Sequence, residues 1–130
     1  MQSVNLMITI NRDSKDVYDF VSDLQNLPKW AKAFCLYIKK EGDSWQAITT
    51  LGEIKIKMTP RNTFGILDHF VYIKPDVEIY VPMRVVANEK GSEVIFTLFR
   101  QPDMTDSQFA RDQKWVREDL QALKLVMETK

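Results

Sequence analysis

Asp68 and His69 form the first pair of residues that could carry chemistry, because they interrupt an apolar segment at 63–72 that is predicted to be a strand. Neighbouring residues of a strand point to opposite faces, so only one of the two can face the interior. An inward His69 could act as a general base or hold the polar end of a ligand. The alternative is a histidine that is hydrogen-bonded to a carboxylate or carbonyl, or one that lies on the outer face.

Arg84 is the second candidate, and it stands within the apolar run 81–86. A charge in such a run lies on the solvent face or is paired inside. An inward guanidinium could bind a ligand carboxylate through two hydrogen bonds. An outward one would form a surface or structural ion pair instead. Tyr80 lies on the same side of this strand and is a further candidate for orienting a ligand.

Asp112 is the third candidate. It falls within the broad apolar arc of the predicted C-terminal helix, with Asp119 beside it two turns later, and a carboxylate there needs a partner. We predict a small polar cluster of Asp112, Arg84 and His69 that faces a cavity. The alternative is that Asp112 lies beyond the sheet rim and complements the helix dipole. Phe109 begins the apolar line of the same helix and is a candidate for the cavity wall.

A scaffold must position these candidates, and 130 residues suit a single domain over 1–130. Alternating apolar residues predict strands, and apolar residues at helical spacing predict helices. Pro82 is expected at a bulge or an edge-facing position, because proline cannot donate to a sheet ladder. The predicted strands are 4–10, 34–40, 44–50, 52–58, 63–72, 77–86 and 93–100, and the predicted helices begin near residues 13, 26 and 106.

Hairpin-length connections between the later strands imply an antiparallel sheet. The long C-terminal helix, which a capping box at Thr105–Gln108 opens, is the only element large enough to cover one face of that sheet. The predicted fold class is therefore α+β: a seven-stranded curved antiparallel sheet around a long C-terminal helix, with two short helices after the first strand. Such a helix grip often leaves a cavity between sheet and helix.

Five segments carry a resemblance to a known family. The opening RDSKDVYDFVSDLQNLPKWA (12–31) and the ending FARDQKWVREDLQALKLVME (109–128) resemble the START/SRPBCC helix-grip superfamily. GILDHFV (65–71), VPMRVVAN (81–88) and EVIFTLFRQPDM (93–104) resemble its small bacterial members, which are polyketide cyclase/dehydrase-like. The resemblance implies a central cavity for hydrophobic or amphipathic molecules, an Asp-His pair at the strand of His69, and a short second helix that makes Trp30 a lid. Only some members of the superfamily are enzymes.

Composition narrows the function further. The 18 basic and 18 acidic residues argue against a nucleic-acid partner, whose phosphates a binding protein neutralises with an excess of cations. One cysteine and one histidine cannot form an internal disulfide or a zinc cage, and no metal or other cofactor is predicted.

The sequence shows neither the pattern of a secretory signal nor that of a membrane span, so a cytoplasmic location is expected. The oligomeric state stays open, with a homodimer among the alternatives.

A small-molecule binding protein is the favoured function, with Arg84, His69 or Tyr80 orienting the polar end of an apolar or amphipathic ligand. The second hypothesis is a polyketide cyclase/dehydratase-like enzyme that uses His69 as acid and base, with Asp112 or Arg84 assisting. The third is a protein-interaction module, which would need an exposed apolar patch.

Overall fold

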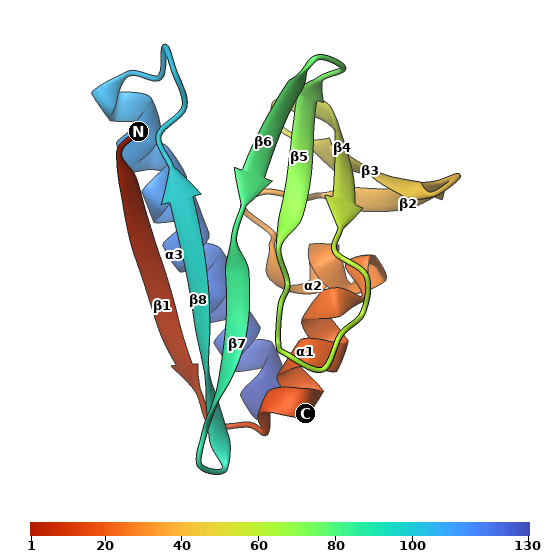
Figure 1. Ribbon diagram of the computed structural model, residues 1–130, viewed down its shortest axis with the longest axis vertical. Coiled ribbons are helices and arrows are strands. Elements are labelled where there is room, and N and C mark those ends of the chain that lie inside the picture. Colours follow the sequence, from red (N-terminus) through yellow and green to blue (C-terminus); the bar gives the residue numbers. More distant parts are fainter.

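The computed structural model describes residues 1–130 and confirms an α+β fold with antiparallel sheet and a long C-terminal helix (Figure 1). Two short helices follow the first strand, and all later strands precede the long helix. The elements are, in chain order, β1 (Ser3–Ile10), α1 (Ser14–Ser22), the 3-10 turn η1 (Leu24–Asn26), α2 (Leu27–Trp30), β2 (Tyr37–Glu41), β3 (Ser44–Thr49), β4 (Gly52–Met58), β5 (His69–Lys74), β6 (Val77–Val81), β7 (Met83–Asn88), β8 (Gly91–Phe99) and α3 (Asp106–Glu128).

The strands form two sheets, which corrects the prediction of one seven-stranded sheet. One sheet has three strands in the order β1-β8-β7, and the other has five in the order β2-β3-β4-β5-β6. All neighbouring pairs are antiparallel, as predicted. In Figure 1 the two sheets stand side by side, and α3 runs behind the three-stranded one.

Pro82 explains the additional strand. It divides the predicted strand 77–86 into β6, which pairs with β5, and β7, which pairs with β8. Proline has no backbone N–H and cannot donate to either ladder, while its carbonyl oxygen still accepts from the amide of Thr97 at 3.0 Å. A single segment therefore crosses from one sheet to the other at the proline, and Pro82 lies between two strands and not, as predicted, at a bulge or an edge-facing position within one strand.

The predicted strand 63–72 begins only at His69, because Asn62 folds the residues before it into a loop. The Asn62 side chain donates to the carbonyl of Ile66 at 2.9 Å and accepts from the amides of Phe64 and Ile66 at 3.0 Å. These bonds occupy backbone groups that a sheet ladder would need. Asp68 consequently lies in the loop that leads into β5.

The predicted strand 34–40 also starts later, at Tyr37. The chain leaves α2 in a turn in which the amides of Phe34 and Cys35 donate to the carbonyl of Ala31, at 3.1 and 2.7 Å. This turn buries Cys35, which is 1% exposed. The segment that sequence alternation assigns to a strand is therefore used to close the end of the core.

The helices α3 and α1 begin where their caps predict. Thr105 Oγ1 accepts from the amide of Gln108 at 3.1 Å, and Gln108 Oε1 accepts from the amide of Thr105 at 2.9 Å, which completes the capping box of α3. Asp13 caps α1 by accepting from the amide of Lys15 at 3.1 Å. In Figure 1 α1 and α2 lie below the five-stranded sheet and beside β7. No helix of the chain is long and apolar enough to cross a membrane.

Candidate ligand-binding site

A cavity of about 690 Å³ lies between the strands β4 to β8 and the helix α3. Of the 32 residues that line it, 23 are hydrophobic, a composition typical of small-molecule sites. Its sheet wall follows strand alternation, in which every second side chain points to the same face. The register places Ile56, Val71 and Ile79 in one row across three strands. The wall residues of β4, β5 and β6 are Ile54, Ile56, Met58, His69, Val71, Ile73, Lys74, Val77, Ile79 and Val81.

Residues of α3 line the cavity at every third or fourth position, so they form one face of the helix. The lining residues are exposed at one end of the cavity and buried at the other. Leu51 and Ile73 are 65% and 52% exposed, whereas Trp30 and Val81 are 5% and 7% exposed. We call the exposed part, near the β5–β6 hairpin, the mouth, and the buried part, near α2, the inner end. The α3 residues of the wall are Gln108, Arg111, Asp112, Trp115, Val116, Asp119 and Leu120.

His69 lines the cavity on the sheet side, opposite Val81 in the register. Its Nδ1 is 3.0 Å from the carbonyl oxygen of Leu67. Because a carbonyl can only accept, Nδ1 carries the proton and Nε2 keeps its lone pair. Burial lowers the pKa of His69 below its usual value, although the bond to Leu67 acts in the opposite direction. The structure thus presents a neutral imidazole whose Nε2 has no partner within the protein.

Asp119 is the other unusual polar group of the wall, and it is only 7% exposed. Its Oδ1 accepts from the amide of Ala33 at 2.9 Å, so it fixes the turn after α2 to the middle of α3. No cation lies within ion-pair distance of this carboxylate. Burial raises the pKa of Asp119 from 3.8 to about 6, the nearby charge of Glu118 adds to this, and the amides of Ala33 and Phe34 oppose it. A buried carboxyl with such a pKa is typical of functional sites.

Asp112 also lines the cavity, two helical turns before Asp119 and closer to the mouth. Its Oδ1 accepts from Arg111 Nη2 at 3.2 Å, and the side chains are 23% and 39% exposed. The Arg111 guanidinium in turn stacks over the ring of Trp115, 4.6 Å from its centroid. Asp112 is therefore neutralised by its own helix neighbour, and Arg111 is held at the wall by an aromatic face.

The two aromatic candidates occupy different places. Trp30 lies at the inner end of the cavity, where its indole Nε1 is buried and has no hydrogen-bond partner. Phe109 is buried, at 5% exposure, beneath the guanidinium of Arg100, and it is not among the residues that line the cavity. Trp30 therefore contributes to the wall at its closed end, whereas Phe109 packs beside the site.

Asp68, Arg84 and Tyr80 come together outside the cavity. Asp68 accepts hydrogen bonds from Tyr80 Oη at 2.8 Å, from the amide of Met83 at 2.8 Å and from Arg84 Nη1. None of the three lines the cavity. As predicted, Asp68 and His69 point to opposite sides of the chain. The predicted cluster of Asp112, Arg84 and His69 is not formed, because the loop before β5 brings Asp68 to Arg84 on the far side of the sheet.

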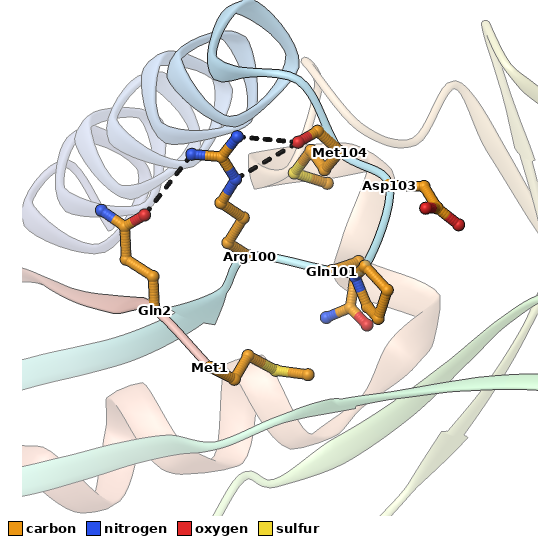
Figure 2. Close-up of a pocket in the computed structure, with 7 residues that line it drawn as sticks. Met1, Gln2, Arg100, Gln101, Asp103 and Met104 are labelled. Atoms are coloured by element: carbon orange, nitrogen blue, oxygen red, sulfur yellow. Dashed lines mark hydrogen bonds between the residues drawn. The ribbon is translucent and has the colours of Figure 1, made fainter.

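A second hollow of about 400 Å³ lies between the start of β1 and the segment 100–104 (Figure 2). Figure 2 shows the Arg100 guanidinium engaged on both sides: Nη2 and Nε donate to the carbonyl of Met104 at 2.9 and 3.2 Å, and Nη1 donates to Gln2 at 3.5 Å. Only two of its seven lining residues are hydrophobic. This hollow lacks the apolar wall of the larger cavity, and its cation is already partnered by protein groups.

The two antiparallel sheets and the long C-terminal helix form a helix-grip fold, and the resemblance to the START/SRPBCC superfamily is confirmed as a likeness of fold. No protein-family model and no curated protein matches the sequence.

Solved structures give the comparison in detail. The chain is similar to XoxI from Bacillus cereus, with 14% identity, a TM-score of 0.78 and coverage of 98% of this chain and 96% of that chain. It is similar to the Aha1 dimer from Colwellia psychrerythraea, with 19% identity, a TM-score of 0.78 and coverage of 98% and 97%. It is also similar to Ara h 8.0201, with 11% identity, a TM-score of 0.71 and coverage of 99% of both chains.

Proposed function

We propose that this protein binds a hydrophobic or amphipathic small molecule in the cavity between the sheets and α3. The observation that carries the proposal is the cavity itself, which has about 690 Å³ of space and 23 hydrophobic residues among 32 in its wall. Pockets of drug-sized ligands span roughly 300–1,000 Å³ and combine an apolar wall with a few placed polar groups. His69 and Asp119 are such groups, and the mouth offers a route of entry.

Titration with N-phenylnaphthylamine, a neutral apolar dye whose fluorescence rises in apolar surroundings, tests the proposal. We expect saturable binding of one dye per chain. Val71→Trp should weaken it at least about tenfold, because the indole would fill space in the middle of the sheet wall. Tyr72→Trp is the matched control, since residue 72 points to the opposite face of β5. Absence of saturable binding, or equal affinity in both variants, would contradict the proposal.

A second candidate function is a cyclase/dehydratase-like reaction. One observation favours it: His69 is a neutral imidazole with an unpartnered Nε2 on the cavity wall. Such a nitrogen could remove the proton next to the carbonyl of a bound β-hydroxyketone and then return it to the β-hydroxyl, so that the carbon–oxygen bond breaks and water leaves the α,β-unsaturated ketone. Mass spectrometry of a model β-hydroxyketone incubated with the protein would detect the loss of water, and His69→Leu should abolish it. Without turnover in the native protein, binding alone would stand.

A further inference from the structure

The inner end of the cavity contains two hydrogen-bond acceptor atoms without a partner in the protein, and no free donor that a ligand could reach. The hydrogen bonds of the two residues end on Asp119 Oδ1 and His69 Nδ1, and the amide of Phe34, which lies near Asp119, donates to the carbonyl of Ala31, so Asp119 Oδ2 and His69 Nε2 accept none. Among fully buried polar side-chain atoms, only Trp30 Nε1 and Ser92 Oγ lack a partner. Both acceptor atoms therefore keep some accessible surface, and both residues line the cavity, whereas the Trp30 indole N–H is fully buried. An apolar space that contains only acceptors is complementary to a hydrogen-bond donor.

The cations of the cavity lie elsewhere. Arg111 is paired with Asp112 and stacked on Trp115, and Lys74 is exposed at the mouth. A carboxylate pushed to the inner end would meet the lone pairs of Asp119 and His69 with no cation to neutralise it, so it would be desolvated without compensation. A negatively charged head group would therefore stay at the mouth, near Lys74.

We propose that the inner end binds a hydroxyl group, alcohol or phenol, which donates its hydrogen bond to Asp119 Oδ2 while the apolar body of the ligand fills the cavity. This inference rests on the proposed function and names the ligand class for the same site. Asp119 is held in place for this role by the amide of Ala33, which occupies Oδ1 and leaves Oδ2 free. A hydrogen bond to a charged acceptor is stronger than one between neutral groups.

A matched pair of ligands tests the inference. Para-octylphenol and its methyl ether share the same apolar body, but only the phenol can donate. Their affinities are measured by displacement of N-phenylnaphthylamine from the wild type, Asp119→Asn and Glu118→Gln. The asparagine keeps an acceptor for the Ala33 amide and replaces Oδ2 by a donor. Glu118→Gln removes the neighbouring charge, which lies outside the cavity wall, and serves as the control.

The expected result is a phenol-to-ether affinity ratio about tenfold higher in the wild type than in Asp119→Asn, with Glu118→Gln like the wild type. An equal ratio in the wild type and Asp119→Asn would overturn the inference and leave the proposed function intact. Failure of both ligands and the dye to bind the wild type would overturn the proposed function, and the inference with it.

Carbon NMR of the wild type gives a second test that does not depend on the folding of a variant. A donor at Oδ2 favours the ionised carboxylate, so saturation with the phenol should lower the pKa of Asp119 by at least about one unit. The methyl ether should lower it less. An unchanged Asp119 pKa in the phenol complex would overturn the inference.

Discussion

At the scale of residues, Asp119 couples stability to pH. Its pKa is raised from 3.8 to about 6 by burial, so between about pH 4 and pH 6 the folded chain holds a proton that the unfolded chain has released. The free energy of unfolding therefore falls as the pH rises through this window, and the loss persists above it. Two pKa units correspond to about 3 kcal/mol, an upper figure for one residue.

Asp119→Asn should remove this dependence. Urea unfolding at pH 4, 5, 6 and 7 would give the difference in free energy of unfolding between variant and wild type. We expect that difference to shift in favour of the variant by up to about 3 kcal/mol between the lowest and highest pH. Asp19, Glu93 and Glu128 have lowered pKa values and act with the opposite sign, but they are common to both proteins. A difference that does not change with pH would contradict the burial of an unpaired carboxyl.

The Asp68 cluster should serve stability and leave ligand binding unaffected. Asp68→Ala leaves the donors of Tyr80, Met83 and Arg84 without their acceptor. We therefore expect a loss of about 2 kcal/mol in the free energy of unfolding. Arg84→Met should cost less, because the Arg84 side chain is 39% exposed. Dye affinity should stay unchanged in both variants. A weakened affinity in a variant of unchanged stability would place this cluster in the binding site.

The sequence identified the polar residues that stand within apolar segments, but it did not show which of them contact one another. Strand alternation predicts that only one of Asp68 and His69 faces the interior, and this holds although Asp68 lies in the loop before β5. The pairing of Arg84 with Asp68 depends on a loop that Asn62 shapes, and no periodicity reveals such a loop. Asp119 stands beside Asp112 in the same apolar arc, so helical spacing could have identified it. What distinguishes the two is Arg111, which neutralises Asp112 only.

At the scale of elements, caps were predictable and strand ends were not. The capping box of α3 was readable because its residues are adjacent in sequence. Thr105→Ala should lower the free energy of unfolding by about 1 kcal/mol, whereas Thr105→Ser keeps the hydroxyl and should be near neutral. Thermal unfolding of the two variants checks this, and equal destabilisation by alanine and serine would show that the cap hydroxyl is not the cause.

Gly65 anchors the loop before β5 at a close approach to β7. It has a φ of 72°, and a Cβ at this position would overlap the carbonyl oxygen of Val85, while its own carbonyl accepts from the Val85 amide at 2.9 Å. Gly65→Ala should destabilise the fold by about 3 kcal/mol or more, because backbone strain and overlap add.

Gly42→Ala is the matched control for that variant. Gly42 also has a positive φ, 63°, but nothing lies within 4 Å of its Cβ position. We expect a loss of about 1 kcal/mol from backbone strain alone. Chemical denaturation of both variants measures the difference, and equal losses would mean that the approach of the loop to β7 does not matter.

At the scale of the whole molecule, the fold class followed from element order, because a long amphipathic helix after a train of hairpin strands has one large apolar surface to cover. The number of sheets did not follow, since one proline transfers a segment from the five-stranded sheet to the three-stranded one. The cavity is likewise a property of the assembled molecule. Alternation showed which side chains of β4, β5 and β6 point inward, but only their register and the position of α3 determine how much space stays between them.

The most direct test of ligand binding in this cavity is the measurement of nuclear Overhauser effects between bound N-phenylnaphthylamine and the protein methyl groups. We predict contacts to Ile54, Ile56, Val71 and Val81, which line the cavity. Contacts confined to exposed methyl groups, such as those of Leu36 and Leu125, which are 61% and 66% exposed, would contradict a ligand-binding cavity between the sheets and α3.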